Sequence, residues 1–118
     1  MSYPKIVRAI TCLVLLSCST LALAETCPPA GTKPDSRWSV LFGDIHSVPF
    51  QGAVYGIYNQ FAMTCNYFTS SLPDGYVLIS NFNVQQPNTN TDRNWQYVAG
   101  HVSCISKNIE TCQFTAQP

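Results

Sequence analysis

Residues 61–82, with the sequence FAMTCNYFTSSLPDGYVLISNF, decide the fold class. Two apolar runs rich in strand-forming residues, 61–69 and 76–82, lie on either side of Leu72-Pro73-Asp74-Gly75. Proline presets the backbone of the second turn position, and glycine accepts the positive φ that a tight turn requires. Val77-Leu78-Ile79 is apolar on both faces of a pleat, which is typical of a strand covered on both sides. The stretch therefore predicts two strands joined by a turn.

The chain on either side of this stretch continues the pattern. Trp38, Val40 and Phe42 recur at every second position and are expected on one face of a strand. A hairpin is expected near Asn59-Gln60, and no segment after residue 25 has the apolar i, i+3, i+4, i+7 spacing of a helix. The expected strands cover 37–42, 53–58, 61–69, 76–82, 95–99, 101–105 and 111–115. Short strands at this spacing predict an all-β fold, a small antiparallel β-sandwich or barrel.

The N-terminus has the features of an export signal. Lys5 and Arg8 precede an apolar run that ends at Ala22-Leu23-Ala24. A basic start, an apolar stretch of about 7–15 residues and a small-x-small end together describe a secretory signal. A retained membrane anchor is the weaker interpretation, because a span takes roughly 20 apolar residues and hydroxyl residues dilute this run. We expect a helical signal peptide over 1–24, a single domain over 25–118 and no membrane span after cleavage.

A second processing route stays open. Leu15-Leu16-Ser17-Cys18 resembles the lipobox of bacterial lipoproteins, in which the cysteine is lipidated and becomes the new N-terminus. Leu16 is bulky for its position in that motif, and Ala22-Leu23-Ala24 is the better match to a cleavage site. The protein is therefore expected to be secreted or periplasmic, with a lipoprotein anchored at Cys18 as the alternative.

Four cysteines remain after the signal: Cys27, Cys65, Cys104 and Cys112. An even number in a small exported domain predicts disulfides, and four cysteines allow three pairings. We favour Cys104–Cys112 with Cys27–Cys65, because the polar residues 106–108 are expected to turn a hairpin that places the first pair face to face. No metal site is predicted, since no Cys-x-x-Cys pair occurs and neither histidine lies at ligand spacing.

Charge and composition exclude several classes of partner. Two of the six lysines and arginines lie in the signal, which leaves four basic against six acidic residues in the domain. Such a domain lacks the basic patch of a nucleic-acid-binding protein, and an anionic membrane surface is not expected as a partner. The chain is 10% charged and 46% hydrophobic, which favours a folded globule over a disordered chain.

Aromatic residues and a long polar loop are the main candidates for function. Residues 85–94 contain only Gln, Asn, Thr, Pro, Asp and Arg and show no periodicity, so they are predicted to form a loop, which is either a binding loop or a loose connector. Exposed aromatic rings stack on sugar rings or pack against a protein partner. The candidate binding residues are Trp95, Tyr97, Tyr58, Asn90 and Arg93. We expect a non-catalytic binding module for a protein or a glycan, without a cofactor.

Two other functions are weighed against this one. In an extended Asp44-Ile45-His46, the carboxylate and the imidazole lie on one face, as in a base with its orienting carboxylate, and Ser47 is the adjacent nucleophile. A small secreted hydrolase centred on Asp44 and His46 is therefore the first alternative. His101 with His46 and a carboxylate is a weaker metal hypothesis. A structural component of the cell envelope is the second alternative.

The cysteines and aromatics also carry a resemblance. The residues that carry it are Cys27-Pro28, Trp38, Cys65-Asn66-Tyr67, Trp95, Cys104 and Cys112-Gln113-Phe114. Together they resemble a family of small exported proteobacterial cysteine-containing β-domains of unknown function. The resemblance spans nearly the whole chain after the signal, and it implies secretion and a β-rich fold but no catalytic residues.

Overall fold

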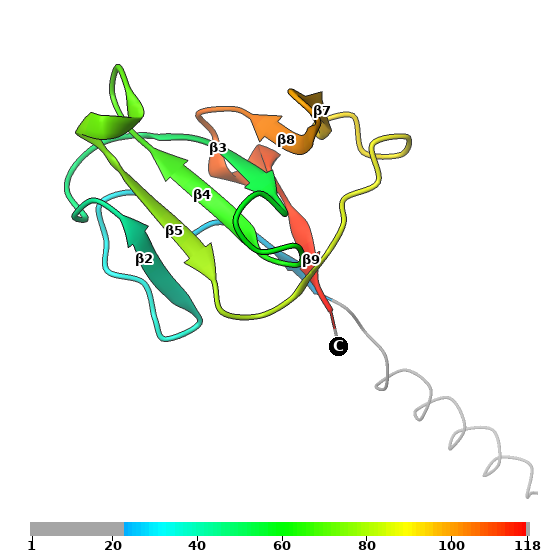
Figure 1. Ribbon diagram of the computed structural model, residues 1–118, viewed down its shortest axis with the longest axis horizontal. Helices are drawn as coiled ribbons and strands as arrows, with labels where there is room; N and C mark the ends of the chain where they lie inside the picture. Colours follow the sequence, from blue (N-terminus) through cyan, green and yellow to red (C-terminus); the bar gives the residue numbers. More distant parts are fainter. Residues whose placement is uncertain (1–22, 118) are drawn as a thin grey trace, which may run out of the picture.

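The computed structural model describes residues 23–117 (Figure 1). All of the predicted signal peptide except Leu23 and Ala24 lies outside the described residues, and so does Cys18. Within this range the chain forms nine strands and two short 3-10 helices. In chain order these are β1 (Ala24–Glu25), β2 (Trp38–Phe42), β3 (Phe50–Tyr55), β4 (Met63–Tyr67), η1 (Leu72–Asp74), β5 (Tyr76–Ser80), β6 (Val84–Gln85), β7 (Gln96–Val98), β8 (His101–Ile105), η2 (Ile109–Thr111) and β9 (Phe114–Ala116).

The strands form two antiparallel sheets, which confirms the all-β prediction. The larger sheet has six strands in the order β2-β5-β4-β3-β8-β7, and the smaller has three in the order β1-β9-β6. In Figure 1 the strands of the small sheet lie behind the large one. The buried core lies between them: Phe114 of β9 meets Trp38 of β2 edge-to-face, with ring centroids 6.2 Å apart, and Val84 of β6 is fully buried.

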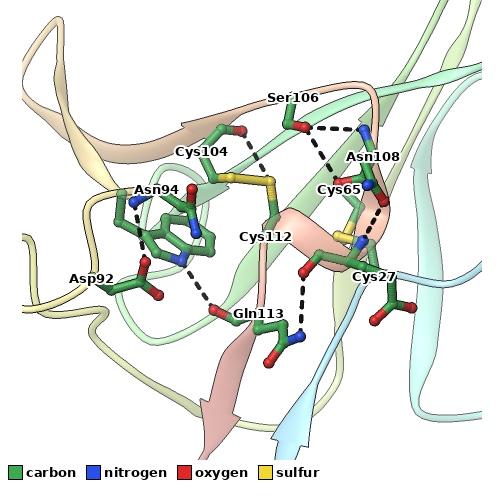
Figure 2. Close-up of a disulfide and its surroundings, with 11 residues drawn as sticks. Cys27, Cys65, Asp92, Asn94, Cys104, Ser106, Asn108, Cys112 and Gln113 are labelled. Atoms are coloured by element: carbon green, nitrogen blue, oxygen red, sulfur yellow. Dashed lines mark hydrogen bonds between the residues drawn. A yellow bond between two sulfur atoms is a disulfide. The ribbon is translucent and has the colours of Figure 1, made fainter.

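The two disulfides have the predicted pairing, and both join one sheet to the other. Cys27 follows β1 of the small sheet and bonds Cys65 in β4 of the large sheet. Cys104 in β8 bonds Cys112, which precedes β9 of the small sheet. Ala53 pairs with both Cys65 and Cys104, so the two bridges leave the same face of the large sheet on either side of one small side chain (Figure 2).

The expected hairpin between Cys104 and Cys112 is not present. Cys104 lies in β8 of the large sheet, whereas Cys112 follows η2 and precedes β9 of the small sheet. Asn108 starts this helix, because its side-chain oxygen accepts a hydrogen bond from Glu110 N–H at 3.0 Å (Figure 2). The polar residues of this segment therefore cap a helical turn, and a sheet-to-sheet crossing brings the sulfur atoms together.

Several predicted boundaries also change. The hairpin near Asn59-Gln60 is confirmed, but its first strand is Phe50–Tyr55 where 53–58 was expected. The turn at 72–75 is a single 3-10 turn, closed by Gly75 N–H donating to Leu72 C=O at 2.9 Å. The stretch predicted as a strand over 111–115 divides between η2 and β9. The expected two-sided covering is confirmed for Val77 and Leu78, of which 2% or less is exposed, whereas Ile79 is partly exposed.

Candidate functional site: a cleft along the open edge of β2

Strand β2 lies at one end of the six-stranded sheet and, within residues 23–117, pairs with β5 alone. Asn81 N–H donates to Arg37 C=O at 2.7 Å, so the Arg37 backbone points toward β5. Hydrogen-bonded and non-hydrogen-bonded pairs alternate along an antiparallel ladder. The backbone groups of Ser39 therefore point toward β5, and those of Trp38 and Val40 point to the open edge. Trp38 N–H donates to Asp35 C=O, which leaves the Trp38 carbonyl and both groups of Val40 there.

A stretch of irregular chain, residues 28–36, forms a wall opposite this edge. Tyr67 and Tyr76 stack with ring centroids 4.5 Å apart, and their hydroxyl groups hold the start of the wall. The Tyr67 hydroxyl donates to Pro28 C=O at 2.6 Å, and the Tyr76 hydroxyl accepts from Gly31 N–H at 2.7 Å. The Cys27–Cys65 disulfide fixes the chain just before it. The start of the wall is thus tied to the sheet by one covalent bond and two hydrogen bonds, and at its end the Asn81 side chain donates to Ser36 C=O at 3.0 Å.

Burial governs the ionisation of these two tyrosines. It raises the pKa of the Tyr67 hydroxyl well above its ordinary value, and the neighbouring Tyr76 raises it further. Burial also raises the pKa of Tyr76, while the hydrogen bond from Gly31 N–H partly offsets that rise. Both hydroxyl groups are therefore neutral around neutral pH, as the bond from Tyr67 to the Pro28 carbonyl requires.

Between this wall and the edge of β2 lies an open cleft of about 820 Å³. Its floor is apolar, and its rim carries one basic and two acidic side chains. The half-exposed Val40 side chain stands at the strand side. The lining residues are Gly31, Lys33, Pro34, Asp35, Ser36, Trp38, Val40, Gly43, Asp44 and Ile45. A cleft with an apolar floor, a mixed rim and outward backbone groups suits an extended polypeptide.

A β-bulge in β2 corrects the expectation that Trp38, Val40 and Phe42 share one face. The pairing register shifts between Val40, which pairs with Leu78, and Phe42, which pairs with Val77. Adjacent residues of β5 point to opposite faces, so the extra residue Leu41 sends Phe42 to the face opposite Val40. The edge strand therefore presents an apolar side chain on each face of the sheet.

The five predicted binding residues do not form one surface. Trp95 is 1% exposed, and its ring N–H donates to Gln113 C=O at 2.9 Å (Figure 2), so the expectation that it stacks on a ligand is wrong. Tyr97 and Tyr58 are 63% and 61% exposed. Tyr97 pairs with Val102, on the disulfide face of the sheet, whereas Tyr58 lies with Phe42 and Val77 on the other face.

The polar loop is ordered by its own side chains. The Asn88 side chain accepts from Asn90 N–H at 2.9 Å, and that of Asp92 accepts from Asn94 N–H at 3.0 Å (Figure 2). Asn90 and Arg93 are exposed on this loop. The loop lies beside β9, where a separate polar pocket of about 220 Å³ includes Asn88 and Asp92.

The Asp44–His46 pair predicted for a hydrolase is not formed. His46 Nδ1 lies 2.7 Å from the backbone carbonyl of Asp44, not from its carboxylate, and Nε2 lies 3.0 Å from the carbonyl of Asp74. Both neighbours are backbone carbonyls, so the imidazole lies between the 43–46 segment and η1 and is not paired with the Asp44 carboxylate. Asp44 itself lines the β2 cleft.

The metal hypothesis built on His46 and His101 gains no support from the structure. Among residues 23–117, no three His, Cys, Asp or Glu side chains are placed to hold one metal ion. No helix in the described part of the chain is long and apolar enough to cross a membrane. The β2 cleft was missed from the sequence because it forms between the irregular stretch 28–36 and the edge of a strand, an arrangement that residue patterns do not reveal.

The chain matches no known family, no curated protein and no solved structure. The resemblance to exported cysteine-containing β-domains therefore stays an expectation, and the site must be interpreted from its own geometry.

Proposed function

We propose that this protein is a non-catalytic binding module that captures an extended segment of a protein partner as an added strand beside β2. The observation that supports this most is the outward direction of the Val40 backbone groups and the Trp38 carbonyl into a cleft of about 820 Å³. Strand addition is a recurring mode of peptide recognition, in which backbone hydrogen bonds give affinity and side-chain pockets give specificity.

The dimensions of the edge suit this ligand. β2 has five residues, and at about 3.3 Å per residue a matching segment is roughly 16 Å long. Of the protein and glycan partners expected from the sequence, the protein is favoured here. A row of backbone donors and acceptors complements another backbone, whereas Trp95, a ring expected from the sequence to stack on a ligand, is buried.

The cellular setting belongs to the same proposal. Two disulfides indicate an oxidising environment, extracellular or periplasmic. We infer that the domain over 25–118 is released from its signal peptide and meets its partner there, as a secreted or periplasmic protein. The rigid wall over 28–36 depends on the Cys27–Cys65 bridge, which that environment maintains.

Peptide selection and amide exchange test the proposal. The oxidised protein is used to select binders from a random heptapeptide library displayed on phage, and amide hydrogen exchange is then measured with and without a selected peptide. The Ser39 amide, bonded to β5, is expected to be protected in both states, whereas the Val40 amide is expected to gain protection only with peptide. Binding without protection of Val40 would contradict strand addition.

A proline substitution sharpens the same test. Val40→Pro removes the outward N–H, and an edge strand tolerates proline when that N–H does not face its neighbour. One hydrogen bond contributes about 1 kcal/mol, so peptide binding is expected to weaken about fivefold while the fold is kept. Tyr97→Ala, at the opposite edge, is the control.

Sedimentation must show a monomer, because a dimer that buries β2 would mean that this edge binds a second copy instead.

A further inference from the structure

A second hollow adjoins the same edge strand on the other face of the sheet. It is a groove of about 370 Å³, and none of the residues within 23–117 that line it is charged. The groove-lining residues are Leu41, Phe42, Tyr58, Leu72, Pro73 and Val77. Val77 forms a fully buried part of it, while Phe42 and Tyr58 are 46% and 61% exposed at its margins. Its only side-chain polar group is the Tyr58 hydroxyl.

The groove is held open by ordered elements on both sides. The loop that carries Tyr58 is closed by Gly56 N–H donating to Ala62 C=O at 2.9 Å and by Phe61 N–H donating to the Asn59 side chain at 3.1 Å. The opposite wall, η1, is fixed by Pro73 and by Ser71 Oγ donating to the Asp74 carboxylate at 3.1 Å. The walls are preorganised, so an incoming side chain need not order them.

The bulge connects the groove to the cleft. Val40 pairs with Leu78, on the disulfide face, and Phe42 pairs with Val77, on the groove face. A strand added beside β2 has side chains that alternate between the two faces. Side chains on one face therefore lie over the cleft beside Val40, and those on the other lie beside Phe42, at the margin of the groove.

We propose that the groove receives one large apolar side chain, such as Leu, Phe or Met, from the captured segment, and thereby selects which segments bind. This inference rests on the proposed function. The match is chemical as well as geometric: the lining is apolar, lacks charge and has a volume that suits one or two large side chains. A charged side chain at that position loses its hydration without gaining a partner, so such segments are rejected.

A double-mutant cycle tests the inference. The probe is the tightest heptapeptide from the phage selection, with each position replaced by alanine in turn and titrated against the wild-type protein, Tyr58→Ala and the control Tyr97→Ala. One apolar position of the peptide is expected to lose tenfold or more in affinity for the wild-type protein but less than threefold for Tyr58→Ala. Its two neighbours, which face the cleft, are expected to show no such coupling.

The outcomes separate this inference from the proposed function. A peptide that protects the Val40 amide but shows no coupling to Tyr58 at any position would overturn the groove assignment and leave strand capture intact. Coupling to Tyr97 in place of Tyr58 would overturn it as well. If no selected peptide protects Val40, strand capture itself is wrong and the groove loses its occupant. Because Tyr58 lies exposed in a loop, Tyr58→Ala is expected to leave the unfolding curve unchanged.

Discussion

The two ends of the six-stranded sheet are both open strands, but they differ in what surrounds them. β7 has three residues, all exposed, and joins β8 through Ala99-Gly100, where φ is positive at both positions (52° and 85°). β2 has five residues, a wall over 28–36 opposite its edge and the groove on its other face. Tyr97 of β7 was a candidate binding residue from the sequence. Exposure of one side chain, however, does not by itself form an enclosed site. The comparison teaches that a strand edge becomes a candidate site when fixed walls enclose its backbone groups.

The largest expected difference between the two ends comes from their disulfides. Cys27–Cys65 anchors the β2 wall and spans 38 residues, whereas Cys104–Cys112 anchors β8, beside β7, and spans eight. Loop-closure entropy predicts losses of about 4 and about 2.5 kcal/mol in the free energy of unfolding when each pair is replaced by alanine. Denaturant unfolding measures both. Only Cys27→Ala/Cys65→Ala is expected to speed amide exchange at Gly31; equal exchange in both variants would mean that the wall does not depend on its bridge.

A pair of glycines compares the packing at the two ends. Gly43 and Gly100 have similar positive φ values, 77° and 85°. A Cβ at Gly43 would clash with the Gly75 carbonyl oxygen, whereas one at Gly100 meets no atom of residues 23–117 within 4 Å. Gly100→Ala is expected to cost about 1–2 kcal/mol from backbone strain alone, and Gly43→Ala about 3 kcal/mol or more because a backbone clash is added. Thermal unfolding distinguishes them. Similar losses would show that the end of β2 is as loosely packed as the β7–β8 turn.

The sequence predicted the layers better than the site. The alternating apolar runs of 61–82 led to the all-β class and the β4–β5 connection, and the even cysteine count led to two disulfides, whose favoured pairing is confirmed. The hairpin argument for Cys104–Cys112 was wrong, because a capped 3-10 turn and a hairpin turn use the same polar residues, here Asn108. The alternation of apolar residues predicts which face of a strand is buried only where the strand pairs with its neighbour without a bulge.

The site depends on features that such patterns do not contain. The shift at Leu41 reverses the face of Phe42, and it arises from pairing with β5, some 35 residues away along the chain. Trp95 was expected to be exposed because it follows a polar loop, but that loop is ordered by its own Asn and Asp side chains and leaves the indole in the core. In both cases contacts between residues distant in the sequence, Phe42 with Val77 and Trp95 with Gln113, decided which way the side chain points.

The smallest expected effect tests the wall of the β2 cleft through pH. Burial raises the pKa of Tyr67 in the folded protein above its unfolded value of about 10. The folded state then holds a proton that the unfolded state releases, so this contribution to stability is full below about pH 10 and declines by about 1.4 kcal/mol per pH unit above it. Tyr67→Phe removes the bond to Pro28 C=O and is expected to cost about 1–2 kcal/mol at pH 8.

The deficit of Tyr67→Phe is then expected to shrink toward zero near pH 11, because the variant has no proton to lose at this position. Guanidinium unfolding at pH 8, 10 and 11 measures the trend, with Tyr97→Phe at the β7 end as the matched control. If Tyr67→Phe and the wild-type protein lose stability in parallel over this range, the Tyr67 hydroxyl ionises without releasing the wall, and the difference between the two edges does not reside in that hydrogen bond. A deficit that closes for Tyr67→Phe alone places the alkaline weak point at Pro28, where the wall of the proposed binding cleft begins.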